Sequence, residues 1–321
     1  MPTLPEHDNF HAHFHRRWGH LNDPHVRTLA WLLDAPDLLD PAAPEWEGRV
    51  ATLGPPAAST RDWLAELDRA PEALHSFLGL QRFTRLGRYA ENLLAYYLQH
   101  EGRLVAHGVQ VRVNKGETVG EFDFLLDDGG RLLHWEFATK LYLLETEGNG
   151  HQADYFVGPN LADTLGAKVR KIMERQLALS RHPAAQASLP RPVAGAQALV
   201  KGWLFYHGQA SVRPGGVSDC HCRGFWCTRD EFRDITGAQA VRPLQRLEWL
   251  APVTMEQSGL ADRAALDALL DTHFAEDGAP LMVALLAPQD GMLVEVERGF
   301  VVSNDWRRRA AERVSIGGAR H

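Results

Sequence analysis

The sequence has few of the residues and runs that mark several large classes of protein. Among its 321 residues are three cysteines, Cys220, Cys222 and Cys227, which are too few and too clustered for a disulfide framework. No apolar run approaches the roughly 20 residues that are needed to span a bilayer. Residues 1–20 are polar and rich in histidine, and they lack the apolar middle of a secretory signal. These absences favour a cytoplasmic protein without a membrane partner.

An excess of positive charge is also missing. The chain has 34 Lys and Arg against 41 Asp and Glu, a formal net charge of −7. No global positive field therefore attracts a polyanion, which argues against a dedicated, high-affinity DNA coat protein. An enzyme with a local basic groove is still compatible with this balance, because metal ions can neutralise phosphate charge. A nucleic-acid partner would therefore have to bind at a local site rather than through the overall charge.

The predicted elements follow the order of an α/β protein with a mixed β-sheet flanked by helices. Asp23 can cap a helix over Asn22–Leu33, and Pro24 suits its first turn. A long helix with one apolar side is expected at Arg82–His100. Further helices are expected at Arg61–Leu67, Pro71–Leu78, Leu161–Leu179 and Ala261–Phe274, and strands at Val109–Val113, Gly120–Leu126, Leu132–Leu144, Leu199–Tyr206, Leu281–Leu286 and Met292–Glu297.

This pattern divides the chain into three regions. Residues 1–80 form an N-terminal helical region, and residues 81–182 contain a helix, three strands and a second helix. Residues 198–321 form an additional C-terminal α+β region, which either folds separately or extends the same sheet.

Acidic residues occupy one face of each of two neighbouring strands. In the strand at 120–126, Glu121 and Asp123 alternate with Phe122, Phe124 and Leu126. In the strand at 132–144, Glu136 shares its face with His134, Ala138 and Lys140. The cluster Asp127-Asp128-Gly129-Gly130 predicts a tight hairpin turn between the two strands, which would bring the acidic faces together. Two carboxylates on an otherwise apolar strand cost desolvation energy unless they are paired or bound to metal.

Glu91 extends this pattern to the preceding helix. It lies beside the apolar stripe, with the small residues Gly87 and Ala95 one turn to either side. Glu91, Asp123 and Glu136 could therefore converge into an oxygen-rich metal site suited to Mg²⁺ or Mn²⁺. Such an ion polarises a phosphodiester and lowers the pKa of an attacking water, and a nearby lysine would assist.

The combination of these motifs resembles the PD-(D/E)XK nuclease superfamily. The residues that carry the resemblance are Glu91 in GRYAEN, Asp123 in GEFDFLL, and Glu136 with Lys140 in HWEFATK. The resemblance covers about a third of the chain and implies a restriction-endonuclease-like core and hydrolysis of DNA or RNA, with catalytic Asp123, Glu136 and Lys140. A longer pattern, from FHRRWGHLNDPHVRTLAWLLDAPDLL through WEFATKLYL and VGPNLADTLGAK to RGFVV, resembles a bacterial family known only as a domain of unknown function.

The lysine departs from the superfamily pattern. The motif places it two residues after the acid, where this chain has Ala138, and Lys140 follows about 7 Å further along the strand. Lys140 could reach back, or Lys168 or Lys171 on the following helix could substitute. Gln176 falls near the centre of that helix's apolar face and needs a partner; it resembles a helix glutamine that lies near the active site in some of these nucleases.

Simpler interpretations exist for each residue. Asp123 and Glu136 could lie on the solvated face of a surface hairpin, Lys140 could pair with Glu136, and Glu121 could sit at the rim. Gln176 could be a core amide that bonds the backbone. Cys220, Cys222 and Cys227, with His221, are a conceivable zinc set, but their spacing is not that of a standard ribbon or finger, so structural Zn²⁺ is not expected.

Two other functions compete with the nuclease hypothesis. The first is a nuclease-like fold without catalysis that binds nucleic acid or protein, which Ala138 and the negative net charge favour. The second is an assembly protein whose acidic hairpin pairs with arginines of a partner. The natural substrate and the oligomeric state stay open.

Overall fold

The computed structural model describes residues 10–79, 85–114, 117–145, 150–208, 212–235, 240–260, 262–276 and 278–318. The helices are α1 (Phe10–Trp18), α2 (Pro24–Asp34), α3 (Ala58–Arg69), α4 (Glu72–Leu78), α5 (Leu86–His100), α6 (Leu165–Lys171), α7 (Arg229–Ile235), α8 (Arg263–Glu276) and α9 (Trp306–Gly318). The strands are β1 (Leu104–Asn114), β2 (Glu117–Asp128), β3 (Arg131–Leu144), β4 (Phe156–Val157), β5 (Val193–Tyr206), β6 (Cys222–Thr228), β7 (Ala240–Pro243), β8 (Thr254–Met255), β9 (Leu281–Gln289) and β10 (Met292–Val302). Short helical turns are η2 (Pro44–Trp46), η4 (Ala153–Tyr155), η5 (Ile172–Gln176), η6 (Leu179–Arg181), η7 (Pro183–Ser188), η8 (Arg246–Trp249) and η9 (Gln257–Gly259).

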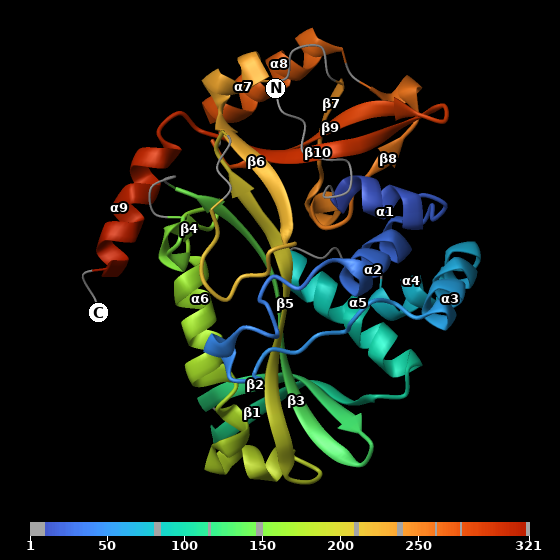
Figure 1. The fold of residues 1–321 in the computed structure, drawn as a ribbon, viewed down its shortest axis with the longest axis vertical. Helices are drawn as coiled ribbons and strands as arrows, with labels where there is room; N and C mark the ends of the chain where they lie inside the picture. The colour runs from blue at the N-terminus through green and yellow to red at the C-terminus, as the bar shows by residue number, and fades with distance from the viewer. Residues whose placement is uncertain are drawn as a thin grey trace.

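All of these strands belong to one mixed sheet of ten strands. Its order is β1-β2-β3-β5-β6-β10-β9-β7, with β4 added to β3 and β8 to β10. The hairpins β1–β2–β3 and β10–β9 are antiparallel, whereas β3, β5, β6 and β10 run parallel to one another. The sheet therefore continues from residues 81–182 into residues 198–321. Figure 1 shows this as a long twisted sheet that runs the length of the molecule.

Helices cover both faces of the sheet. On one face, α1 to α5 pack on a core that includes Trp135, Trp203 and Phe300. On the other face, α6 and η5 pack on β3 and β5 through residues such as Tyr142 and Leu204. Further along that second face, α7 and α8 cover β9 and β10. The chain is thus an α/β protein with a large mixed sheet flanked by helices, with α6 beside one half and α7 and α8 over the other (Figure 1).

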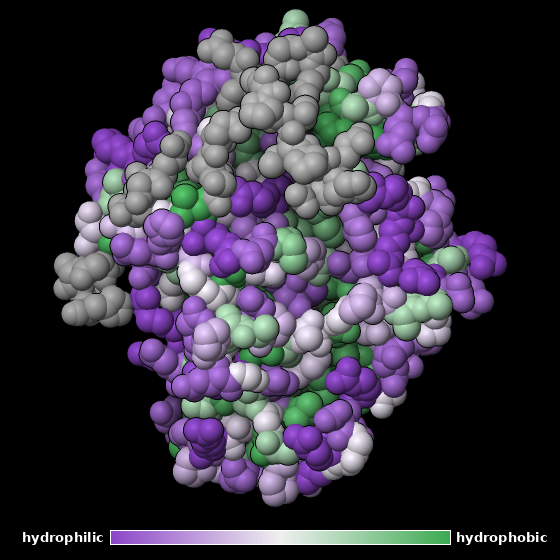
Figure 2. Space-filling view, viewed as in Figure 1, coloured by the Kyte–Doolittle hydropathy of each residue, from purple (hydrophilic) through white to green (hydrophobic). Residues whose placement is uncertain are grey.

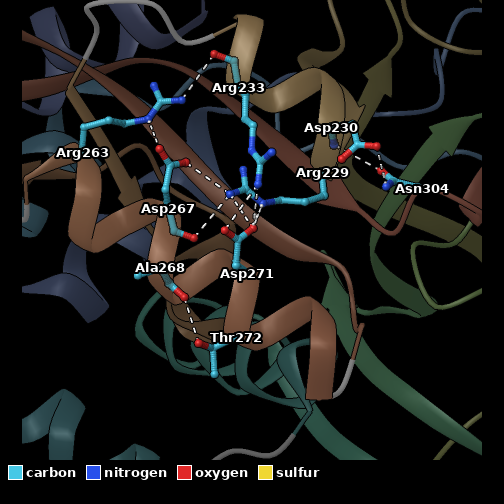
Figure 3. A network of polar contacts seen from close by, with 9 residues as sticks. All are labelled: Arg229, Asp230, Arg233, Arg263, Asp267, Ala268, Asp271, Thr272 and Asn304. Carbon is cyan, nitrogen blue, oxygen red and sulfur yellow. Dashed lines mark hydrogen bonds and ion pairs between the residues drawn. The ribbon is translucent and has the colours of Figure 1, made fainter.

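An arginine and aspartate network joins α7 to α8. Arg229, whose side chain is 6% exposed, bonds Asp271 at 2.8 Å and Asp267 at 3.3 Å. Arg233 also bonds Asp271, and Arg263 bonds Asp267 at 3.0 Å, as Figure 3 shows. Because several charges share partners, this network fixes the two helices to each other more firmly than single surface ion pairs would.

A buried ion pair anchors α1 to β10. Glu295 and Arg298 are both fully buried, and the Arg298 Nη2 donates to Glu295 Oε2 at 2.9 Å. His11 on α1 lies 3.0 Å from Glu295 Oε1, and His15 Nε2 lies 2.9 Å from the Glu295 carbonyl oxygen. Burial alone would raise the pKa of Glu295, but Arg298 and His11 outweigh it and hold that pKa at about 2. The histidines at residues 11 and 15 therefore have structural partners in the sheet.

Several helices differ from the sequence prediction at their ends. The Asp23 cap is confirmed: its carboxylate accepts from the backbone N–H groups of His25 and Val26. The long helix begins at Leu86 because Arg85 is extended, and residues 80–84, including Arg82, lie outside the described residues. The helix expected from Leu161 begins at Leu165 instead, because Leu161 has a left-handed backbone (φ 59°) and Thr164 supplies the cap.

Two of the three cysteines lie on a strand of the sheet, whereas Cys220 lies in the turn before it. Cys222 and Cys227 lie on β6, between β5 and β10, and both are buried. Cys222 packs in the core under α1 to α5, whereas Cys227 packs in the core under α7 and α8. Their thiols point into opposite sides of the sheet, and burial raises the pKa of Cys227 to about 12.

Hydrophobic surface is scattered on the face shown in Figure 2. There, small hydrophobic patches alternate with larger hydrophilic areas. Among the described residues, no helix combines the length and the apolar character that crossing a membrane requires.

Burial of His15 predicts a loss of stability in mild acid. Burial lowers the pKa of His15 from 6.5 to about 4. Between pH 6.5 and about 4, the unfolded chain therefore binds a proton at this residue and the folded chain does not. The free energy of unfolding should therefore fall as the pH drops from 6.5 to 4, and His15 alone should account for about 2 to 3 kcal/mol of the fall. Urea denaturation of the His15→Gln variant should show a shallower pH dependence than wild type. His20→Gln is the control, because His20 is exposed; an unchanged slope in His15→Gln would contradict the assignment.

Candidate metal centre

The centre lies where β2 separates from β3. Their ladder runs from the pair Asp128–Arg131 to the pair Phe124–Trp135 and stops just before Asp123. At that point the backbone N–H of Phe137 donates to Asp123 Oδ2 at 2.9 Å. The side chain of Asp123 thus takes a hydrogen bond at the end of the ladder and is held next to β3.

The break in the ladder also changes which face each residue occupies. Phe124 packs under α5, as expected, but Phe122 packs on the opposite side with Leu179. The prediction that Phe122 shares a face with Phe124 and Leu126 was therefore wrong. The alternation of side chains between the two faces of the sheet is therefore interrupted at Asp123.

Asp123, which is half-buried, and Glu136, which is buried, form a carboxyl pair within hydrogen-bonding reach of each other. Burial raises the pKa of Asp123, and the charge of Glu91 raises it further despite the bond from Phe137. Burial and then the charge of Asp123 raise the pKa of Glu136. Such a pair cannot hold two negative charges without a cation, and otherwise retains a proton.

A second group of carboxylates adjoins Asp123. Oxygen atoms of Glu91, Glu121 and Asp123 lie within 4.8 Å of one another, in the one such group of three that the described residues contain. Glu91 comes from α5 and the other two from β2, so two elements far apart in sequence meet here. Glu121 belongs to this group; Glu136, which was expected in it, does not, although it contacts Asp123.

Two small residues make the approach of these elements possible. A Cβ atom at Gly87, one turn before Glu91, would lie 3.9 Å from the Thr139 hydroxyl, so α5 and β3 are close at this turn. Gly108 on β1 has a positive φ of 65°, and a Cβ there would lie 3.5 Å from the Glu121 carboxylate. Glycine adopts this left-handed backbone conformation at little energetic cost because it has no Cβ atom.

Cationic and imidazole groups contact the outer part of the centre. Arg88 Nη1 donates to Glu91 at 2.9 Å and to Glu121 at 3.3 Å. His107 Nε2 lies 2.8 Å from Glu91 Oε1, and its ring stacks on Phe124 at 5.2 Å between centroids. Neither Arg88 nor His107 was assigned to the metal site from the sequence, because each belongs to it only through the packing of α5 against β1 and β2.

Gln176 and Lys168 contact the inner part. The Gln176 amide donates to Glu136 Oε1, and the Lys168 ammonium donates to Gln176 Oε1 at 2.9 Å. The partners of Gln176 are thus side chains of the site. Gln176 is the last residue of the π-helical turn η5, and such turns occur often at functional sites. Burial, and next the charge of Lys140, lower the pKa of Lys168.

Lys140 points to a different partner. Its ammonium lies 3.8 Å from Asp163 Oδ2, and it is close enough to Lys168 to affect the pKa of that residue. Of the two lysines, Lys168 is the one linked through Gln176 to Glu136. Lys140 lies at the edge of the centre.

His134 is a further residue of the centre, and the sequence analysis gave it no role. It is fully buried, its ring meets Phe122 edge to face at 4.8 Å, and its Nε2 lies 3.9 Å from Glu136 Oε2. The signal for it was present, since His134 shares the strand face of Glu136. What the pattern did not reveal was the complete burial of the imidazole.

A groove of about 590 Å³ lies beside η5. It is lined by the start of β3 and β5, by residues 48–49 and by the segment around η5 and η6, and it carries Arg49, Arg131 and Arg181. Asp128 and Glu174 also line it. The groove thus joins the helical turn that holds Gln176 to a surface with a small excess of positive charge.

The raised pKa of Glu136 predicts that this residue lowers the free energy of unfolding. In the metal-free protein at about pH 8, Glu136→Gln should raise the free energy of unfolding by about 1 to 3 kcal/mol, because it removes a buried group that resists ionisation. Chemical denaturation in the presence of a chelator measures this. Asp128→Asn, on the exposed hairpin turn, should change the stability little. A destabilised Glu136→Gln protein would show that the pair is already compensated.

Comparison with known proteins places the chain in a family without identifying its activity. No curated protein and no solved structure matches the sequence. Residues 27–302 match the family described as Domain of unknown function (DUF1853). This match includes Glu91, Asp123 and Glu136 and all strands of the sheet. Because it spans most of the sequence, the chain belongs to the DUF1853 family.

Proposed function

We propose that this protein is a metal-dependent nuclease that hydrolyses phosphodiester bonds of DNA or RNA. One observation carries the proposal: carboxylates from α5, β2 and β3 meet at the point where β2 leaves β3, and two of them, Asp123 and Glu136, are buried against each other. A chain gains nothing in stability from such a pair. A bound cation compensates it.

The donor set fits Mg²⁺ or Mn²⁺. Glu91, Glu121 and Asp123 offer hard oxygen ligands within 4.8 Å of one another, and an ion with bonds of about 2.1 Å, which spans about 4.2 Å, would draw them slightly together. Glu136 would complete the set from the buried side. A divalent ion in this position supplies charge that polarises a phosphodiester and lowers the pKa of a water.

The side chains around the carboxylates have separate tasks in this proposal. Gln176 fixes the orientation of Glu136 through its amide, and Phe137 fixes Asp123 through its backbone N–H. Lys168 holds Gln176 and brings a buried positive charge near Asp123 and Glu136. That ammonium can stabilise negative charge that develops on a reacting phosphate. Lys140, next to Lys168, adds charge at the edge.

The element order supports a restriction-endonuclease-like core. A helix with Glu91, an antiparallel hairpin with Asp123 and Glu136, and a following helix with Lys168 surround the centre. Arg49, Arg131 and Arg181 in the neighbouring groove are suited to contact the phosphates of a nucleic acid. This local charge is consistent with the negative charge of the whole chain.

A second candidate function is a nuclease-like module without catalysis that binds nucleic acid or protein. The pairing of Arg88 with Glu91 and Glu121 favours it, because this arginine already neutralises part of the outer carboxylate group. Such a module binds nucleic acid and shows no turnover with Mg²⁺ or Mn²⁺.

Nuclease assays with single- and double-stranded DNA and RNA test the proposal. Wild type should cleave at least one of these substrates with Mn²⁺ or Mg²⁺ and not with a chelator. Asp123→Asn and Glu136→Gln should each reduce the rate by at least about 100-fold while circular dichroism shows an unchanged fold. Cleavage that persists in both variants would identify a contaminant. Binding without cleavage in wild type would favour the second candidate.

The two lysines can be separated by the same assay. Lys168→Ala should lower the rate about 10- to 100-fold, because it removes the charge nearest the buried carboxylates and the support of Gln176. Lys140→Ala should have a smaller effect, since its ammonium pairs with Asp163. A larger loss in Lys140→Ala than in Lys168→Ala would assign the catalytic lysine to β3, as the sequence motif suggested.

A further inference from the structure

The inner side of the centre contains a buried histidine whose polar atoms are unused. His134 lies in the middle of β3, between β2 and β5, and is 0% exposed. Neither of its ring nitrogens has a hydrogen-bond partner among the described residues. A buried imidazole normally bonds through at least one nitrogen, so its position requires an explanation.

A second unused atom faces it. No donor among the described residues bonds Oε2 of Glu136, which is buried 3.9 Å from His134 Nε2. The other oxygen of Glu136 accepts from Gln176, and this bond fixes the carboxylate so that Oε2 is directed away from the amide. The two unpartnered atoms therefore form a gap that is too wide for a hydrogen bond between them.

The width of this gap suits a metal ion. Two ligand atoms that each bind one ion at about 2.1 Å can be at most about 4.2 Å apart, and the observed separation is below that limit. Asp123 adjoins Glu136 but does not form a group of three ligand atoms within 4.8 Å with it and His134, so the inner ligand atoms are those of His134 and Glu136, and water would complete the shell of an ion there. Glu91, Glu121 and Asp123 are each partly exposed, whereas His134 and Glu136 are buried, so this position lies deeper than that group.

We propose that His134 and Glu136 hold a divalent cation at an inner position of the centre, with His134 as a nitrogen ligand. An imidazole donor favours transition-metal ions over Mg²⁺, which prefers oxygen ligands and water. The inner position therefore selects an ion such as Mn²⁺, and Asp123 lies between it and the outer carboxylates. The inference rests on the proposed metal centre but not on cleavage of any substrate.

Pulsed electron paramagnetic resonance of bound Mn²⁺ tests the nitrogen ligand directly. Electron spin echo envelope modulation detects a nitrogen nucleus bound to the ion, and labelling the protein with ¹⁵N-histidine shows whether that nitrogen belongs to an imidazole. The full chain is loaded with Mn²⁺ alone, at less than one ion per protein. Wild type should show imidazole modulation that changes with the label.

His107 provides a matched control. It is the other histidine at the centre, and it contacts Glu91 on the outer side. The modulation should be lost in His134→Gln and retained in His107→Gln. Glu136→Gln should lose it as well, and that variant keeps the test decisive if His134→Gln does not fold. In each variant, continuous-wave spectra measure how much Mn²⁺ is bound.

Three results would overturn the inference. Mn²⁺ that binds to wild type without imidazole modulation would show that His134 is only a packed core residue, and the metal-dependent nuclease would still stand. Loss of the modulation in His107→Gln, with retention in His134→Gln, would place the nitrogen ligand on the outer side. Absence of any bound Mn²⁺ would reject the inner position together with the metal centre itself.

Discussion

The burial of Asp123 against Glu136 is the constraint on which the rest of the centre depends. Two carboxyl groups in contact, one buried and the other half-buried, oppose ionisation and therefore oppose folding at neutral pH. The surrounding groups orient these carboxyls more than they neutralise them. Phe137 and Gln176 each donate one neutral hydrogen bond, and the ammonium of Lys168 reaches Glu136 through Gln176. The free-energy cost of burying the two carboxyls therefore stays largely uncompensated, and binding of a cation would lower it.

A second buried carboxylate in the same sheet shows how this chain treats charge that serves structure alone. Glu295 is as deeply buried as Glu136, but it receives a bidentate bond from Arg298 and a contact from His11. Its pKa falls to about 2, whereas burial and its acidic neighbour raise the pKa of Glu136. The same residue type in two buried places thus has opposite electrostatics. Of these two sites, the Asp123–Glu136 pair is the one without a guanidinium partner, which distinguishes a binding site from a structural ion pair.

Sequence alone predicted the parts of the centre that local pattern determines. Alternation placed Glu136 and His134 on one face of β3, and Asp23 correctly marked the start of α2. Features that depend on distant contacts were not predictable. The π-helical turn that directs Gln176 at Glu136, the change of facing at Asp123 and the late start of α6 each depend on contacts across the sheet.

The outer and inner sides of the centre differ in how their negative charge is balanced. On the outer side, Arg88 and His107 contact Glu91 and Glu121, and the side chain of Arg88 is 49% exposed, so this compensation can exchange with solvent ions. On the inner side, Glu136 and His134 are closed off from water, and the hydrogen bond that Glu136 accepts comes from the neutral amide of Gln176. Charge that is screened from solvent interacts over a lower effective dielectric. The inner carboxyls thus contribute the greater part of the attraction for a cation.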